Sequence, residues 1–139
     1  QMQEVINNGK AFEKFKQLVA RQKGDVSYIE NLEKFEKANF VLPIYADKDG
    51  YISELDAQVI GKVSVEIGGG RMKKEDSIDY TVGLELCKKV SDKVCKGELI
   101  ANIYAKSEAD AVKVSNSVFK AFKIEDSIIE YKNPIIEII

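Results

Sequence analysis

The run Gly68-Gly69-Gly70-Arg71 is the part of the sequence whose residue types most directly suggest chemistry. Backbone N–H groups of a glycine-rich loop can surround an anion, and an adjacent arginine can supply the counter-charge. No Lys-Ser/Thr pair follows the glycines, so the run is not a P-loop. We therefore favour a structural interpretation, in which the glycines form a tight turn with positive φ and Arg71 pairs with an acid such as Asp76 or Asp79.

Asp76 and Asp79 follow this run as a pair of candidate carboxylates. Three residues apart, they would share one face of a helix, and paired carboxylates can perform general acid–base catalysis. Such a pair more commonly caps a helix or binds a nearby arginine, so we predict a structural role for both. The chain has no histidine, which excludes Ser-His-Asp and Cys-His catalysis by its own residues. We assign no catalytic, substrate-binding or metal-binding residue, and we expect no cofactor.

The two cysteines, Cys87 and Cys95, are eight residues apart. Without histidine, this spacing does not match the common zinc sites. The spacing permits a disulfide, but the chain carries no secretory signal, so we expect two reduced thiols packed within the fold.

The composition is that of a folded domain with no strong charge bias. The chain has 139 residues, of which 45% are hydrophobic, and 21 basic and 23 acidic residues give a net charge of -2. This balance gives no electrostatic reason to expect a nucleic-acid or membrane partner. No apolar run approaches the roughly 20 residues of a membrane span. We expect a soluble, cytoplasmic protein.

The first part of the chain has the periodicity of an amphipathic helix that ends near Gly24, which we predict as its C′ residue. Gly9 lies on the apolar side, where a small residue would allow another element to approach closely. The chain begins at Gln1 within this helical pattern, so we expect the helix to pack on a domain that precedes it. The alternative is a partner-binding face in its own right. The apolar positions of the helix are Val5, Ile6, Phe12, Phe15, Leu18 and Val19.

Residues 25–40 are mixed and charged, and we predict a linker that includes a short helix at 31–38. From about residue 35 onward, the pattern indicates an α+β unit with short strands and one good helix. Ser107 is a plausible N-cap of that helix, with Asp110 at N3. Pro43 within the first strand suggests an edge position. The predicted strand-like segments are 41–45, 51–55, 61–67, 77–86, 88–96 and 98–105, followed by two runs within 128–139.

Several short motifs, in this order, resemble the C-terminal part of the thymidine and pyrimidine-nucleoside phosphorylases. In two places the sequence departs from the family pattern, since Lys23 replaces the first of two glycines before Asp25, and Ser91 replaces a usual glycine. The motifs are Asn8-Gly9-Lys10-Ala11-Phe12-Glu13-Lys14-Phe15 followed by Val19, Gln22, Gly24 and Asp25, then Gly50-Tyr51-Ile52, Gly68-Gly69-Gly70-Arg71, Asp76, Ile78-Asp79, Val82-Gly83, and Asp92, Val94 and Gly97.

This resemblance implies a fold, a domain division and a parent reaction. Residues 1–34 would be the terminal helix and linker of an upstream α/β phosphate-binding domain. Residues 35–139 would be the C-terminal domain, an α/β-hammerhead related to barrel-sandwich hybrids. In the parent reaction, phosphate attacks the anomeric carbon of a pyrimidine (deoxy)nucleoside and releases the free base and a (deoxy)ribose 1-phosphate. The family's phosphate-binding and base-reading residues lie upstream of the matched segment, so we expect this chain alone to be inactive.

The resemblance also bears on partners and substrates. Its partner would be the rest of the parent chain, and the parent would be a homodimer in which phosphate is a co-substrate. Thymidine and uridine both remain candidate substrates, because the base-reading residues are not in this chain. A related phosphorylase acting on nucleoside monophosphates shares parts of the architecture, although the loop at 68–71 fits the pyrimidine branch better.

The alternative function is a biotinyl- or lipoyl-like carrier, or a stand-alone interaction module. The run 91–97 leading into the strand at 98–105 resembles the strand and turn of such carriers, and Lys106 lies close to the expected carrier position. However, Ala105 and Ser107 flank Lys106 where a biotin carrier has methionines. Lys106 also precedes a helix where a carrier returns into a strand. We therefore favour a solvated lysine.

Overall fold

The structure is a computed structural model that describes residues 2–128. It divides into two compact units, Gln1–Glu36 and Lys37–Ile139, and we describe each by itself.

The first unit contains α1 (Met2–Asn7), α2 (Lys10–Arg21), α3 (Ser27–Glu30) and a 3₁₀ turn (Leu32–Lys34). A single continuous opening helix was therefore the wrong prediction. Gly9 adopts a left-handed conformation with φ 77° and separates α1 from α2, and the side chain of Asn8 accepts a hydrogen bond from the Lys10 N–H at 3.1 Å. A Cβ added to Gly9 would meet no atom within 4 Å, so no described element of the first unit approaches closely there.

The end of α2 is a Schellman motif displaced by one residue from the predicted position. Lys23 is the left-handed C′ residue, with φ 61°, and its N–H donates to the Ala20 carbonyl at 3.0 Å. The Gly24 N–H donates to the Val19 carbonyl at 2.9 Å. A Cβ on Gly24 would lie 2.8 Å from Val19 Cγ1, so Gly24 is required by close packing.

The apolar side chains of the first unit remain exposed. Phe12, Phe15 and Leu18 on α2 are 45%, 47% and 51% exposed, and none of the four helical segments contains a buried residue. The closest aromatic contact in this unit is between Tyr28 and Phe35, whose ring centroids lie 5.1 Å apart in an edge-to-face arrangement. The predicted apolar stripe on α2 is thus present and is not covered by the described part of this unit.

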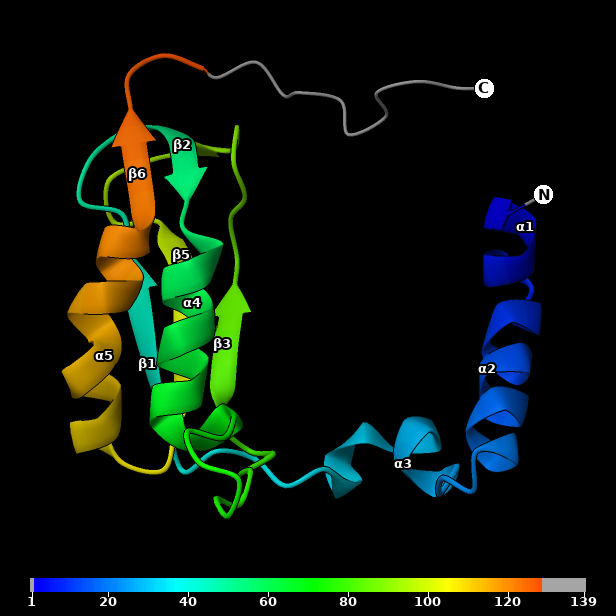
Figure 1. The fold of residues 1–139 in the computed structure, drawn as a ribbon. Coiled ribbons are helices and arrows are strands. Elements are labelled where there is room, and N and C mark those ends of the chain that lie inside the picture. Colours follow the sequence, from blue (N-terminus) through cyan, green and yellow to red (C-terminus); the bar gives the residue numbers. More distant parts are fainter. Residues whose placement is uncertain (1, 129–139) are drawn as a thin grey trace, which may run out of the picture. The chain divides into compact units, whose positions relative to one another are not determined.

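The second unit is built from two small antiparallel sheets and two helices, which confirms the α+β class (Figure 1). One sheet has the strand order β1-β5-β3 and the other β4-β2-β6. The elements are β1 (Phe40–Tyr45), β2 (Gly50–Leu55), α4 (Ala57–Ser64), a π-helical turn (Val65–Gly69), β3 (Gly83–Leu86), β4 (Lys93–Val94), β5 (Leu99–Ala105), α5 (Glu108–Ala121) and β6 (Phe122–Glu125).

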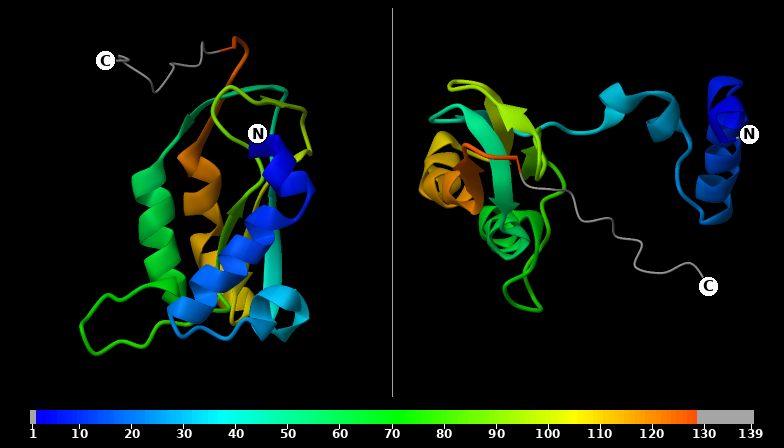
Figure 2. Two further views of the ribbon diagram at one scale, coloured as in Figure 1. Left: turned by 90° about the vertical axis from the view of Figure 1, so that its right-hand side faces the viewer. Right: turned by 90° about the horizontal axis from the view of Figure 1, so that it is seen from above.

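The core of the second unit lies between the helices and the β1-β5-β3 sheet. Figure 1 shows α4 and α5 side by side in front of this sheet, and Figure 2 gives two further views of the same arrangement. Val114 and Val118 on α5 and Ile103 on β5 are at most 1% exposed. Burying side chains of this size contributes roughly 1.5–3 kcal/mol each, so this layer is the main source of stability for the unit.

The predicted strand at 61–67 is wrong, because this segment is the end of α4 and the π-helical turn. Val63 and Ile67 are both buried, and a spacing of four residues satisfies a helical face as well as the alternation of a strand. Asp56 is the N-cap of α4, and its carboxylate accepts hydrogen bonds from the N–H groups of Gln58 and Val59 at 2.9 and 3.0 Å. This cap fixes where the helix begins.

The remaining local predictions are confirmed in part. Pro43 lies on β1, which is an edge strand, and β5 occupies nearly the whole predicted segment. Ser107 caps α5 by accepting a hydrogen bond from the Asp110 N–H at 3.2 Å. The short helix predicted at 31–38 is only the 3₁₀ turn, and the predicted strands at 77–86 and 88–96 shrink to β3 and β4. The strand-like runs after residue 128 lie outside the described residues.

Candidate functional site

The loop that begins at Gly68 is closed on itself by hydrogen bonds. Gly68 has φ 102°, as predicted for the glycine turn, and its carbonyl accepts a hydrogen bond from the Asp79 N–H at 2.9 Å. The Asp76 carboxylate folds the tip by accepting from the N–H groups of Met72 and Lys73 at 3.1 and 2.9 Å. A Cβ on Gly70 would lie 2.7 Å from Val65 Cγ2. The glycines therefore allow close packing against the end of the helix.

The predicted pairing of Arg71 with Asp76 or Asp79 is wrong. Arg71 is exposed, and within residues 2–128 it forms no ion pair with either aspartate. Asp79 instead pairs with Lys106 at 3.3 Å, and hydrogen bonds from Thr81 hold the pKa of the Asp79 carboxyl below its usual value. Both aspartates accept hydrogen bonds that hold the loop in shape. A carboxylate with a lowered pKa is a poor general acid at neutral pH.

Lys106 lies between β5 and α5, directly before the N-cap Ser107. Its side chain is 61% exposed and pairs with Asp79. A carrier lysine would instead require a turn between two strands, so this position does not favour the carrier alternative.

Cys87 and Cys95 are both free thiols, as predicted, but both are exposed. The expectation that they are packed within the fold is wrong. Each follows a short strand, β3 and β4 respectively, where the chain leaves the sheet for a surface turn.

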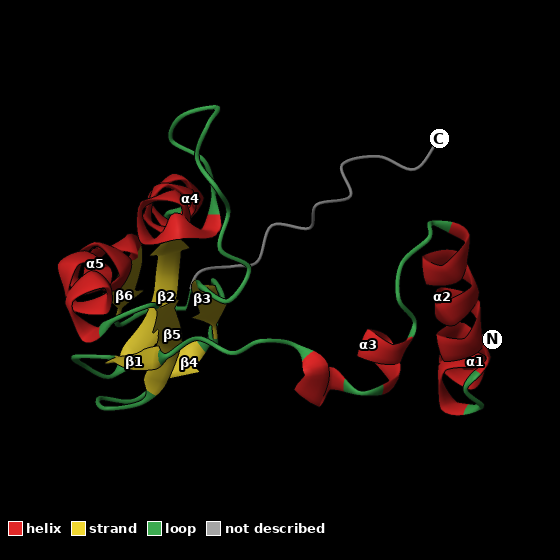
Figure 3. Cartoon of the chain, turned by 90° about the horizontal axis from the view of Figure 1, so that it is seen from below, coloured by secondary structure: helices red, strands yellow, loops and turns green. Residues whose placement is uncertain are grey.

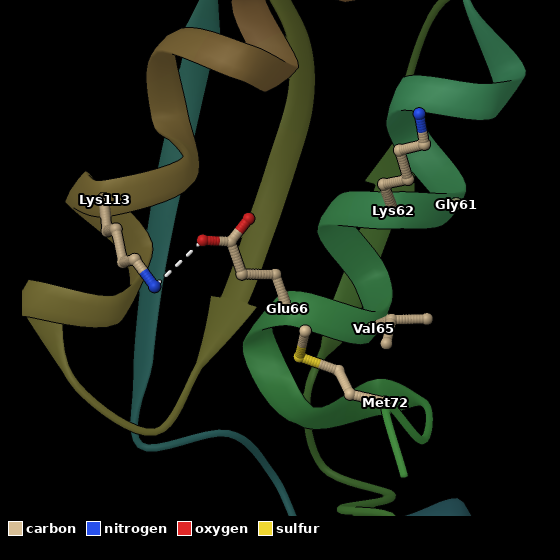
Figure 4. Close-up of a pocket in the computed structure, with 6 residues that line it drawn as sticks. All are labelled: Gly61, Lys62, Val65, Glu66, Met72 and Lys113. Atoms are coloured by element: carbon tan, nitrogen blue, oxygen red, sulfur yellow. Dashed lines mark ion pairs between the residues drawn. The ribbon is translucent and has the colours of Figure 1, made fainter.

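A shallow groove of about 520 Å³ lies at the surface of α4 and α5 (Figure 4). Glu66 and Lys113 form an ion pair of 2.9 Å across it, and this pairing raises the pKa of Lys113 above its usual value. A lysine that stays protonated does not act as a base near neutral pH. The residues that line the groove are Gly61, Lys62, Val65, Glu66, Met72 and Lys113.

A third cluster connects β3 and β5 on the face of the sheet opposite to the helices. One carboxylate oxygen of Glu85, Oε2, accepts hydrogen bonds from Asn102 Nδ2 at 2.9 Å and from the Tyr104 hydroxyl at 2.8 Å. These two bonds lower the pKa of Glu85, and the neighbouring carboxylate raises the pKa of Tyr104. Sequence reasoning missed this cluster and the groove, because strand pairing and helix packing bring together residues that are far apart in the chain.

Within residues 2–128, no group of three or more carboxylate or cysteine side chains could hold a metal ion. Over the same residues, no helix is long and apolar enough to cross a membrane.

The fold therefore defines a mixed helix-and-sheet domain in which polar side chains mainly hold surface turns. Residues 51–125 match the family model described as the pyrimidine nucleoside phosphorylase C-terminal domain. The chain is also 43% identical over 107 residues to the pyrimidine-nucleoside phosphorylase of Bacillus subtilis (strain 168). That alignment covers 77% of this chain and 25% of the relative. The chain belongs to the pyrimidine nucleoside phosphorylase C-terminal domain family, and it spans about a quarter of the length of this relative.

Proposed function

We propose that this chain is the non-catalytic, structural C-terminal domain of a pyrimidine-nucleoside phosphorylase. The observation that carries the proposal is the match of residues 51–125 to a domain family named for that enzyme. The parent reaction would be the phosphorolysis of a pyrimidine (deoxy)nucleoside to the free base and a (deoxy)ribose 1-phosphate, in the manner of the thymidine phosphorylases.

The chemistry of this reaction supports a non-catalytic role for the chain itself. The transition state has oxocarbenium character, so an enzyme must hold phosphate against the sugar and stabilise negative charge on the departing base. Both tasks require cationic or hydrogen-bond-donating groups that converge on one enclosed site. In residues 37–128, Lys113 of the groove instead pairs with Glu66, and Lys106 pairs with Asp79, both on the surface.

The remaining features of the proposal concern the whole enzyme. We propose that the second unit is an α/β-hammerhead and that residues 1–34 are the last helical segment and linker of an upstream α/β domain. The exposed stripe at Phe12, Phe15 and Leu18 supports this assignment, since a helix of an α/β domain buries such a stripe. The parent would be a cytoplasmic homodimer that uses phosphate as co-substrate, without a cofactor and without a nucleic-acid partner.

A domain exchange tests this function. We would replace the matching C-terminal segment of the Bacillus subtilis enzyme with this chain and measure phosphate-dependent release of thymine and uracil. We expect the chimera to be active, and the Bacillus enzyme without its C-terminal segment to be inactive. A matched control carries Val114→Asp, which buries a charge in the core of the second unit and should abolish the rescue.

A chimera that folds as the parent enzyme does, but shows no phosphorolysis, would contradict the proposal. So would full activity of the chimera that carries Val114→Asp, because the rescue would then not depend on the folded domain.

A further inference from the structure

The turn between α1 and α2 contains the only Asn-Gly pair of the sequence, Asn8-Gly9. Figure 3 draws the two helices in red and the turn that joins them in green. Asn8 is exposed, and none of the six residues of α1 that precede it is buried. The backbone at this turn is therefore open to water and can move without disturbing a core.

The side chain of Asn8 is folded over the peptide bond that follows it. Its Oδ1 atom accepts a hydrogen bond from the Lys10 N–H at 3.1 Å, which makes an Asx-turn. This hydrogen-bonded ring contains both Asn8 Cγ and the Gly9 nitrogen, so it holds the two atoms near each other, and the bond polarises the Cγ carbonyl. By contrast, the Oδ1 atom of Asn7 accepts from Gln3 Nε2 at 3.0 Å, so that side chain is turned back along α1.

Gly9 leaves its own nitrogen sterically accessible. It has no side chain, its φ is 77°, and a Cβ added to it would meet no atom within 4 Å. The Gly9 N–H donates to the Ile6 carbonyl at 3.2 Å, at the end of α1. A six-residue helix without buried residues opens readily in water, so this bond protects the nitrogen only part of the time.

We propose that Asn8 is a modification site that loses its side-chain amide by deamidation, with water as the only co-reactant. The deprotonated Gly9 nitrogen attacks Asn8 Cγ, the N–Cγ bond forms and the Cγ–Nδ2 bond breaks. The amide nitrogen leaves as ammonia and takes up a proton in place of the one that Gly9 lost. Water then opens the succinimide ring. Opening at Cγ gives aspartate, and opening at the main-chain carbonyl carbon gives isoaspartate.

Either product changes the junction between the two helices. Each conversion adds one negative charge to the net charge of -2, and this carboxylate lies before α2, where the helix dipole favours it. Isoaspartate also carries the main chain through Cβ and Cγ, so one carbon atom is inserted between α1 and Gly9. The site does not rest on the proposed function, since it requires only residues of the first unit.

Incubation of the 139-residue chain in mildly alkaline buffer, followed by trypsin digestion and mass spectrometry, tests this site. The readout is the mass of the peptide that ends at Lys10, which rises by about 1 Da when an amide becomes a carboxylate. Hydroxylamine cleaves a succinimide, so it should cut the chain between Asn8 and Gly9. We expect conversion at Asn8 to be at least about tenfold faster than at Asn7 or at Asn116 within α5, because neither of these precedes a glycine.

Two variants and a peptide separate the site from the sequence motif. Gly9→Ala places a Cβ beside the attacking nitrogen without meeting a neighbouring atom, and it should slow conversion at least about tenfold. Asn8→Gln keeps an amide but lengthens the side chain, so the succinimide cannot form and the conversion should stop. The blocked peptide of residues 5–13 gives the rate without the fold.

Three results would overturn the proposal. The first is conversion of the chain more than about tenfold more slowly than the peptide, because the fold would then protect the bond. The second is conversion at Asn7 as fast as at Asn8. The third is an unchanged rate in Gly9→Ala.

Discussion

Replacement of Gly50 by alanine tests how the β4-β2-β6 sheet is held together. Gly50 is the first residue of the central strand β2, and its φ is +154°. An added Cβ would lie 2.6 Å from the Glu125 carbonyl oxygen and 2.8 Å from Ile124 Cγ2, both on the edge strand β6. Because one of these atoms belongs to the backbone, the clash is relieved only if β6 moves away from β2.

The expected cost has two parts. An L-residue with positive φ costs roughly 1–2 kcal/mol, and overpacking that displaces backbone costs roughly 1–3 kcal/mol more. Gly50→Ala should therefore lower the free energy of unfolding of the second unit by about 2–5 kcal/mol. Gly97→Ala is the matched control, because Gly97 has φ +82° but an added Cβ there would meet no atom within 4 Å. It should show only the conformational cost of roughly 1–2 kcal/mol.

The assay must report on the second unit alone, because the first unit can unfold separately. The amide of Ile52 is suitable, since it is fully buried and donates to the Asp92 carbonyl at 2.9 Å. Native-state hydrogen exchange at this amide gives the free energy of opening in each variant. If Gly50→Ala costs no more than Gly97→Ala, the packing of β2 against β6 described above is incorrect.

Three further predictions concern the core, a helix end and pH. Val114→Ala should destabilise the second unit by about 2–3 kcal/mol, whereas Val112→Ala on the exposed side of the same helix should change its stability by less than about 0.5 kcal/mol. Urea unfolding measures both changes, and equal effects would contradict the assigned helix face. Lys23→Gly should stabilise the first unit by about 1 kcal/mol, because glycine adopts the left-handed conformation without steric cost. Hydrogen exchange of the α2 amides measures this change in stability, and a loss of protection would refute the prediction. The pKa of Asp79 is lowered in the folded state, so its contribution to stability is present above the unfolded pKa and is lost as pH falls through the lowered folded pKa. Asp79→Asn should therefore destabilise the chain at pH 6 and much less at pH 2. A destabilisation that is independent of pH would show that the carboxylate charge is not involved.

The parts of the fold that were predicted correctly are those whose signals are local. The N-cap Ser107 and the apolar spacing that follows it are sufficient to place α5, because capping and helix amphipathicity act within a few residues. The alternation along β5 is likewise sufficient, since this central strand has a buried face for nearly its whole length.

The parts that were missed depend on contacts between distant residues. Val63 and Ile67 fit a helix and a strand equally well, and packing of α4 on α5 and β3 selects the helix. Arg71 was expected to pair with an acid such as Asp76 or Asp79, but Lys106, which follows β5, reaches the Asp79 carboxylate instead. The cluster at Glu85 exists only because β3 pairs with β5 in one register, which places Asn102 directly opposite. Neither the strand pairing nor its register follows from local pattern alone.

The central claim is that this chain supports phosphorolysis without performing it. The most direct test is to incubate the purified 139-residue chain with thymidine or uridine and inorganic phosphate, and to measure the free base by chromatography. The Bacillus subtilis enzyme, assayed at the same concentration, is the positive control. We predict no release of thymine or uracil above the rate without protein. Phosphate-dependent release by the chain alone would contradict the claim, since the catalytic groups would then have to lie among its own residues.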